Sequence, residues 1–429
     1  MPRFSALRGM RDLLPEDVYK RDLVLGAVRK LIKAYGYEVV DTPTLESFDL
    51  ISTKIGEEIR HRMYIFDDLG GRKVALRPEV TTSIARIVAT TLRSAPKPLR
   101  LAYVANCFRY DNPQMGRFRE FCQAGFELLG SSHSEADSEI LSISNNFMRE
   151  LGFRDYRLMV GHIGILRGVL KESGLSEEQQ NLLFELIDKG KQSEALAYLK
   201  DISAPERCIS AIKGLFSAKG SDLGRVLSEG KTAIRDFESS RRALENLAEI
   251  VGLLGGVSLD LNLGLARGLE YYTGMIFEVY VPSLGIALEG GGRYDNLVEL
   301  FGGDKCPAVG CSIGVDRVVM AAESQKLFKP YDVDKKSIYV VCLDVSLNRA
   351  AIDLANRLRD EGFRTRLDVM RKGVKKMLSQ ISERGVPIAI LVTPSELKEG
   401  KFVVKFMDKG TQEVMSLEET IAALKEQFR

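Results

Sequence analysis

The chain has 429 residues, 45% of them apolar, and its 61 Lys and Arg residues nearly balance its 59 Asp and Glu residues, giving a net charge of +2. This composition excludes a disordered chain and a strongly basic nucleic-acid-binding tail, and favours about two or three globular domains. No apolar run approaches the roughly 20 residues of a membrane span, and the N-terminus lacks the apolar segment of a signal peptide. We therefore expect a cytoplasmic protein without membrane contact.

The cysteine and histidine content offers little for a structural metal. No two of the six cysteines form a Cys-x-x-Cys pair, and only three histidines accompany them. We expect reduced thiols that mostly pack in the interior, and no metal held by Cys or His. The residues concerned are Cys107, Cys122, Cys208, Cys306, Cys311, Cys342, His61, His133 and His162.

The first predicted element is a helix that begins at Pro15 and stops at Gly36. Proline is favoured in the first helical turn and glycine just beyond the last one. Apolar residues between Leu23 and Ile32 recur at the helical period. The following segment, 37–40, reads as a short strand that runs towards Pro43.

The pattern of residues in the middle of the chain changes twice. Short apolar strands that also carry many charges occupy residues 60–129, whereas residues 171–250 show only helical patterns. Strand patterns return at 258–262 and 274–280. The order predicts a helical domain inserted into an α+β domain.

The C-terminal part has a different pattern, beyond a polar linker that contains Pro330. Strands are predicted at 338–342, 364–368 and 388–392, with helices between them. Alternating strands and helices indicate a small domain with parallel strand pairing.

The first group of chemically interesting residues lies on a predicted hairpin around 108–121. Its loop places Arg109 on one strand and Arg117 and Arg119 on the other. Three guanidinium groups suit a polyphosphate, because each can bind two oxygens. Beyond the loop, Gln123 and Glu127 share one strand face, where a bound ligand could satisfy them.

Two further groups are rich in glycine. Arg267 is followed directly by a glycine and then by the tyrosine pair Tyr271 and Tyr272. The segment provides a cation beside an aromatic wall. The run 290–295 combines three glycines with Arg-Tyr-Asp, and Arg317 lies at the start of a helix, where anions are favoured.

Each of these features also has a simpler explanation. An isolated arginine is usually a surface charge, glycine-rich turns are often only turns, and paired tyrosines are often core residues. The sequence has neither a phosphate-binding P-loop nor a dinucleotide-binding glycine motif. Composition and spacing alone therefore indicate only a soluble, anion-binding enzyme of the α+β type.

The joint pattern resembles a known family. An arginine on a hairpin strand (Arg109) and an arginine on a late helix (Arg317) resemble the second and third signature motifs of class II aminoacyl-tRNA synthetases. The first helix, its strand and Pro43 resemble the first motif, which builds the dimer interface in that family.

Four segments make the resemblance more specific. Residues 267–272 and 290–295 resemble the histidine-specific signature pair of histidyl-tRNA synthetases. Residues 8–15 and 76–81 are similar to the opening and the amino-acid loop of the same family. The resemblance extends from about residue 4 to the C-terminus, nearly the whole chain.

The resemblance implies an α+β fold. It consists of a class II antiparallel-sheet catalytic domain at 1–170 and 257–325, an inserted helical domain at 171–256, a linker at 326–336, and a C-terminal α/β anticodon-binding domain at 337–429. The implied reaction attaches L-histidine to tRNA(His) with ATP through a histidyl-adenylate, with Mg²⁺ on the β- and γ-phosphates. The implied assembly is a homodimer.

The family's residue roles carry over to matching positions of this chain. Glu79, Thr81 and Gln123 would hold the α-amino group of histidine, and Glu127 and Tyr272, with Tyr271 nearby, would read the imidazole. Arg109 and Arg267 would flank the α-phosphate, and Arg117 and Arg317 would hold the β- and γ-phosphates. Asp111 falls where the family often has Glu near the adenine. In this assignment Arg267 and Arg109 are the catalytic residues, and Arg267 takes a place where many class II enzymes use a metal.

Contacts with tRNA are expected at two places. Gln114 lies in the hairpin loop, and a basic segment between 364 and 376 has six positive charges against Asp368 alone. A solvated helix face is the simpler explanation of such a segment, but the resemblance to an anticodon-binding domain favours RNA contact. The residues expected to contact RNA there are Arg371, Lys372, Lys375 and Lys376.

Three alternatives stay open at this point. A regulatory subunit of ATP phosphoribosyltransferase shares the synthetase-like fold without catalysis, but it normally lacks the C-terminal domain and has an eroded histidine signature. A synthetase for threonine or proline is disfavoured by the segment 267–272. A purely structural RNA-binding protein would show no exchange of pyrophosphate into ATP with histidine.

Overall fold

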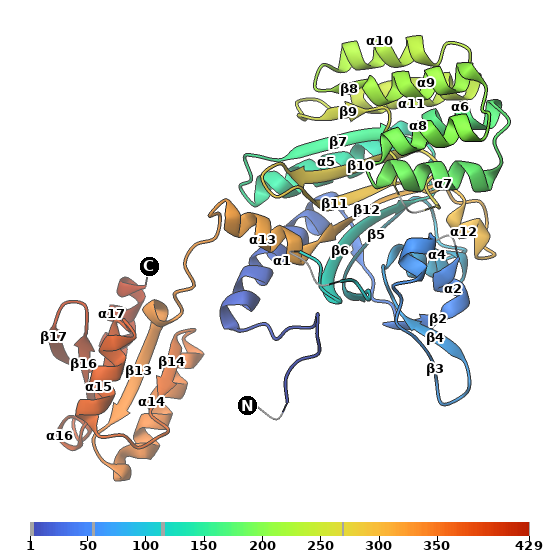
Figure 1. The fold of residues 1–429 in the computed structure, drawn as a ribbon. Coiled ribbons are helices and arrows are strands. Elements are labelled where there is room, and N and C mark those ends of the chain that lie inside the picture. Colours follow the sequence, from blue (N-terminus) through green and yellow to red (C-terminus); the bar gives the residue numbers. More distant parts are fainter. Residues whose placement is uncertain (1–3, 54–55, 113–115, 268–269, 429) are drawn as a thin grey trace. The chain divides into compact units, whose positions relative to one another are not determined.

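The computed structural model describes residues 4–53, 56–112, 116–267 and 270–428. It divides the chain into two compact units, Met1–Lys329 and Pro330–Arg429. Each unit has its own strands and helices (Figure 1).

A nine-stranded sheet with the order β1-β5-β6-β12-β11-β10-β7-β9-β8 forms the centre of the first unit. The pairs from β5 to β7 are all antiparallel, and β1 and β9 join it in parallel. The strands are β1 (Glu38–Val39), β5 (Leu99–Phe108), β6 (Glu120–Leu129), β7 (Arg157–His162), β8 (Lys219–Gly220), β9 (Asp260–Asn262), β10 (Met275–Val281), β11 (Ile286–Arg293) and β12 (Ala308–Gly314).

Three helices pack together on this sheet: α1 (Pro15–Tyr35), α5 (Ser134–Glu150) and α13 (Val315–Ser324). The predicted first helix is confirmed, with Pro15 in its first turn and Gly36 in the left-handed conformation at its C-cap. Its buried residues between Val24 and Ile32 form the apolar face that the sequence predicts.

A small sheet and three helices lie between β1 and β5 in the chain. The sheet has the order β2-β4-β3. Its elements and the neighbouring helices are β2 (Leu45–Ser47), α2 (Phe48–Ser52), α3 (Glu57–Arg60), β3 (Ile65–Asp67), β4 (Lys73–Leu76) and α4 (Thr81–Ala89).

The segment between β7 and β9 is mostly helical, as predicted. Its elements are α6 (Ile163–Glu172), α7 (Glu177–Asp188), α8 (Gln192–Asp201), α9 (Glu206–Ser217), α10 (Leu223–Ala233) and α11 (Glu238–Gly252). The expectation of helices alone was wrong at β8, which pairs with β9 at the edge of the large sheet. These helices share one continuous hydrophobic core with the sheet, so the boundaries 171 and 256 of an inserted domain stay a prediction.

The second unit contains a five-stranded sheet with the order β14-β13-β15-β16-β17. The three predicted strands pair in parallel, and two further antiparallel strands extend the sheet. The elements are η1 (Asp334–Lys336), β13 (Ser337–Cys342), η2 (Val345–Leu347), α14 (Asn348–Asp360), β14 (Arg364–Leu367), α15 (Val374–Glu383), β15 (Ile388–Val392), α16 (Pro394–Leu397), β16 (Lys401–Phe406), β17 (Thr411–Ser416) and α17 (Leu417–Gln427).

The first unit also contains a helix of four residues, α12 (Leu297–Leu300), which follows β11 and precedes β12 in the chain.

Candidate active site

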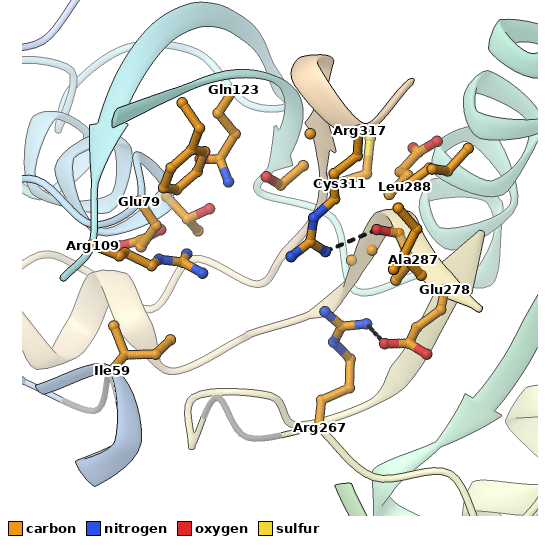
Figure 2. Close-up of a pocket in the computed structure, with 18 of the residues that line it drawn as sticks. Ile59, Glu79, Arg109, Gln123, Arg267, Glu278, Ala287, Leu288, Cys311 and Arg317 are labelled. Carbon is orange, nitrogen blue, oxygen red and sulfur yellow. Dashed lines mark hydrogen bonds and ion pairs between the residues drawn. The ribbon is translucent and has the colours of Figure 1, made fainter. Parts of the chain in front are cut away.

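A cavity of about 530 Å³ opens over β6, β10, β11 and β12 of the first unit (Figure 2). Its size is typical of a site for a small ligand. It brings together all the residues that the sequence analysis assigned to histidine and ATP. These are Glu79, Thr81, Arg109, Asp111, Arg117, Gln123, Glu127, Arg267, Tyr271, Tyr272 and Arg317.

A buried carboxylate, Glu79, lies directly before α4. Its Oε1 accepts a hydrogen bond of 3.0 Å from the backbone N–H of Thr82 and another from the Thr82 hydroxyl. Its Oε2 is buried and has no hydrogen-bond partner among the described residues. An unpaired buried carboxylate oxygen is costly unless a ligand satisfies it, and an ammonium group can do so.

The second buried carboxylate, Glu127, lies on β6 with 0% of its side chain surface exposed. Thr81 donates a hydrogen bond of 2.8 Å to one of its oxygens, and the Tyr294 hydroxyl donates to the other. Burial raises the pKa of Glu127 to about 8, although both hydrogen bonds act in the opposite direction.

Glycines form the surface beneath these side chains. Gly310 lies opposite Glu127 in the pairing of β12 with β6, and a side chain there would collide with the Glu127 carboxylate. Gly125, two residues before Glu127 on the same strand, leaves the space that the Tyr103 ring occupies. The two glycines therefore make room for the Glu127 carboxylate and the Tyr103 ring against the sheet.

Aromatic rings form the wall of the cavity beside Glu127. The Tyr271 ring lies edge-on to Tyr272 at 4.9 Å and to Tyr294 at 5.8 Å between ring centroids. Burial raises the pKa of all three phenols, that of Tyr272 to about 12. Their hydroxyls are therefore neutral at physiological pH and can donate hydrogen bonds.

Arginines also line the cavity. Figure 2 shows Arg109, Arg267 and Arg317 pointing toward one space, and Arg117 also lines the cavity. The Nε atom of Arg109 donates to the carbonyl of Pro78 at 2.8 Å, and Arg317 donates to the carbonyls of Gly116 and Ala287 at 3.0 and 2.9 Å. These bonds fix the guanidinium planes.

The arginine cluster has excess positive charge. The pKa of Arg317 is lowered, first by burial and then by repulsion from Arg109 and Arg117. Such a cluster can be relieved by a ligand with several negative charges, such as a polyphosphate.

Three further residues predicted for the site each contact another side chain. Asp111 pairs with Arg62 at 3.0 Å, and Gln123 accepts a weak hydrogen bond from the Cys107 thiol. Arg267 forms a 2.5 Å ion pair with Glu278.

Sequence reasoning missed the contacts that hold the assigned residues. Thr82, which binds Glu79, and Glu278, which binds Arg267, received no role, and neither did Tyr294, which lies in the quoted 290–295 segment. Strand alternation places Glu278 on the face of β10 that carries neither Phe277 nor Val279, which are buried. That pattern was the available signal for Glu278.

The residues expected to contact RNA lie in the second unit, except one. Arg371 and Lys372 occupy the loop before α15, and Lys375 and Lys376 lie in its first turn. Asp368 accepts hydrogen bonds from the backbone of Met370 and Lys372 at 2.9 and 2.8 Å, which shapes the loop. Gln114 lies outside the described residues.

The described residues show neither a metal-ligating cluster nor a membrane-spanning helix. They hold no group of three or more His, Cys, Asp or Glu side chains arranged for a metal ion. None of their helices has the length and apolar character needed to cross a membrane.

The chain is similar to known proteins in sequence and in structure. A family model described as histidyl-tRNA synthetase matches residues 9–318, and one described as anticodon binding domain matches residues 337–427. A histidine–tRNA ligase from Methanocaldococcus jannaschii is 41% identical over 97% of this chain and 98% of its own length.

Two solved structures are similar to the whole fold or most of it. The histidyl-tRNA synthetase from a Nostoc species superimposes with a TM-score of 0.80 over 100% of both chains, at 20% identity. A Bacillus halodurans protein, titled ATP phosphoribosyltransferase regulatory subunit/histidyl-tRNA synthetase, gives 0.77 at 26% identity, over 88% of this chain and 96% of that one.

The antiparallel sheet, with one arginine beside its hairpin and another on α13 around a single cavity, defines a class II aminoacyl-tRNA synthetase. The predicted fold class is thereby confirmed. Within that class, the chain belongs to the histidyl-tRNA synthetase family, because the family model and a 41% identical relative cover most of its length.

Proposed function

We propose that the cavity binds L-histidine and ATP, joins them as histidyl-adenylate, and then transfers histidine to tRNA(His). The overall reaction, ATP-dependent charging of tRNA with histidine, accords with the family of the chain. One observation supports the site assignment most strongly. The cavity is lined by the buried carboxylates of Glu79 and Glu127, by the phenols of Tyr271 and Tyr272, and by Arg109, Arg117, Arg267 and Arg317. This set of groups matches a ring-bearing ammonium compound next to a polyphosphate.

At the amino-acid end, Glu79 would take the α-ammonium group on its unpaired Oε2, with Thr81 and Gln123 beside it. Glu127 would accept the N–H of the imidazole, and the Tyr272 hydroxyl would donate to the other ring nitrogen. This arrangement selects the neutral imidazole, which offers one donor and one acceptor.

In the first step, a histidine carboxylate oxygen attacks the α-phosphorus of ATP, and the bond to the β-phosphate oxygen breaks. Negative charge grows on the α-phosphate oxygens, where Arg267 and Arg109 would meet it, while Arg117 and Arg317 would hold the departing pyrophosphate. Preorganised cations lower such a barrier because they need not reorient during the reaction. The terminal ribose hydroxyl of the tRNA then attacks the carbonyl carbon, and AMP leaves.

Mg²⁺ would enter with ATP on the β- and γ-phosphates. The cavity carboxylates of Glu278, Asp111 and Asp316 each pair with an arginine. Phosphate oxygens would therefore be the main ligands of the ion, and the bound Mg²⁺ would neutralise part of the polyphosphate charge.

The C-terminal unit would bind the anticodon end of the tRNA through the basic residues in the loop before α15 and in its first turn. Gln114 would also contact the tRNA. We also propose a homodimer in the cytoplasm. The edge strand β1 leaves Val39 with 64% of its surface exposed, and an exposed apolar edge can pair with a second copy.

The test is histidine-dependent exchange of labelled pyrophosphate into ATP, measured with each of the twenty amino acids. We expect exchange with histidine alone. Exchange with another amino acid would overturn the specificity, and exchange with none would favour the regulatory-subunit alternative or a structural RNA-binding role.

A further inference from the structure

The guanidinium group of Arg267 lies at a fixed place between two neighbouring strands. In the antiparallel pairing of β10 with β11, Glu278 is directly opposite Gly290. Residues directly opposite each other point to the same face of a sheet. On that face, a long acidic side chain therefore stands beside a position that has no side chain at all.

The missing side chain of Gly290 makes room for the guanidinium. A Cβ atom at position 290 would lie 2.6 Å from Nη1, 2.7 Å from Nη2 and 2.8 Å from Cζ of Arg267. These three atoms would be its nearest neighbours, so the Arg267 guanidinium occupies the space next to Gly290. Any side chain larger than hydrogen would displace the guanidinium and leave the strand backbone in place.

Glu278 holds the same group from the side. Its Oε1 is 2.5 Å from Nη1 of Arg267, and the carbonyl oxygen of Phe277 is 3.4 Å from the same nitrogen. The side chains of Arg267 and Glu278 are only 21% and 29% exposed. The hydrogen bonds to Phe277 and Glu278 both use Nη1, so they leave Nη2 for an incoming oxygen.

The pair also affects the charge of Arg267. Burial acts to lower its pKa, but the Glu278 carboxylate, followed by Tyr272, Asp188 and Tyr271, outweighs burial and raises the pKa. Arg267 thus keeps its full charge in a largely buried place. Removal of Glu278 would leave a buried cation without its main partner.

We propose that Glu278 and Gly290 together form a seat that positions Arg267 for the α-phosphate, so that Glu278 is a positioning residue for adenylate formation. The proposal rests on the proposed contact between Arg267 and the α-phosphate. Glu278 fixes one edge of the guanidinium, and Gly290 allows it to lie flat on the sheet. A guanidinium released from this seat loses its alignment, and a misplacement of about 1 Å can cost about 100-fold in rate.

The test is a double-mutant cycle that combines Arg267→Ala with Glu278→Ala, together with the single variant Gly290→Ala. Single-turnover formation of histidyl-adenylate and the KM for histidine are measured in each full-length protein. We expect Glu278→Ala and Gly290→Ala each to slow adenylate formation by about 10- to 100-fold, with little change in the histidine KM. In the Arg267→Ala background, Glu278→Ala should cause almost no further loss, because its effect passes through Arg267.

Two matched controls separate this effect from general damage. Asp260→Ala removes a carboxylate from another Arg–carboxylate pair of the same sheet, with Arg157 at 3.7 Å, and Gly255→Ala adds a methyl group where no atom lies within 4 Å. Both should keep the wild-type rate. Thermal unfolding of every variant shows whether it is folded.

The outcomes distinguish the proposal from the function on which it rests. Wild-type protein without histidine-dependent exchange would overturn the proposed function, and Arg267→Ala with a normal rate would overturn the role of Arg267. If both hold, the positioning role would be overturned by one result: Glu278→Ala slows adenylate formation by the same factor in the wild-type and in the Arg267→Ala background. An unchanged rate in folded Gly290→Ala would overturn the seat.

Discussion

Both donors of Thr82, its backbone N–H and its hydroxyl, are directed at the same oxygen of Glu79. The Glu79 carboxylate is thereby fixed by one oxygen while the other, Oε2, stays buried and unpaired among the described residues. The Oε2 atom is thus preorganised for a cationic group.

The first prediction follows from this pairing. Glu79→Gln should raise the histidine KM by about 10- to 100-fold, because a hydrogen bond to a charged group contributes about 1.5–3 kcal/mol. The KM for ATP should change little. The measurement is pyrophosphate exchange at varied histidine, and inhibition by 3-(imidazol-4-yl)propionate, which lacks the amino group, serves as the control. If the variant weakened the binding of both compounds equally, Glu79 would not be the ammonium partner.

The second prediction concerns recognition of the ring. Glu127→Ala should raise the histidine KM by about 100-fold or more, because a site built around polar ring atoms leaves its own groups unpaired when one partner is lost. Glu120→Ala, on the same strand but outside the cavity, is the matched control. An equal rise in the ATP KM would contradict a role in reading the ring.

The wild-type histidine KM should also fall as pH rises from 6 to about 8.5. Free histidine loses its ring proton near pH 6.5, and Glu127, whose pKa is raised to about 8 by burial, becomes the ionised acceptor over the upper part of this range. A KM that is flat across this range would exclude both titrations from binding.

The third prediction concerns stability. The folded protein keeps a proton on Glu127 up to about pH 8, whereas the unfolded chain loses it near pH 4.3. The folded state therefore binds more protons between these values, and stability falls as pH rises through this window, by at most about 1.4 kcal/mol per pH unit. Glu127→Gln should remove this contribution.

Melting temperatures measured from pH 5 to 9 test whether stability falls as pH rises. The melting temperature of the Glu127→Gln variant should increase relative to that of the wild type as pH rises towards 8. Above pH 8 the difference between the two melting temperatures should stay constant. Glu289, also buried and with its pKa raised to about 7, acts in the same direction in both proteins, so only the difference between them is informative. A difference that does not vary with pH would mean that Glu127 is already ionised.

The fourth prediction separates the two units. Deletion of residues 330–429 should leave histidine-dependent exchange but weaken tRNA charging, because the whole cavity lies in the first unit. The cut keeps Leu327 and Phe328, which pack against the core of that unit. Parallel loss of exchange and charging would show that the C-terminal unit contributes to the catalytic fold.

The fifth prediction concerns two lysines in the first turn of α15. The double variant Lys375→Ala/Lys376→Ala should weaken tRNA binding and reduce the slope of log affinity against log salt by about one to two, because each phosphate contact releases counterions. Exchange should be unaffected. The matched control is Lys398→Ala/Lys409→Ala, which also removes two exposed lysines from this unit. Equal effects of the two double variants on affinity and slope would indicate a nonspecific charge effect.

Local patterns predicted most elements, and motif resemblance predicted the residues around the cavity. Helix signals at Pro15 and Gly36 act over a few residues and can be read directly. The two-residue strand β8 is too short to show a period. The partnership of Glu278 with Gly290 depends on the register of two strands, which is set by the packing of the whole sheet.

The glycines beneath Glu127 limit how the amino-acid specificity could be redesigned. Gly310 and Gly125 already leave room for the Glu127 carboxylate and the Tyr103 ring, so any larger residue at either position meets an existing side chain. A variant that accepts a smaller amino acid therefore cannot be made by placing a larger residue at Gly310 or Gly125. Changes of specificity must come from the side chains around the ring, such as Tyr272, and among random substitutions the two glycine positions should tolerate almost none.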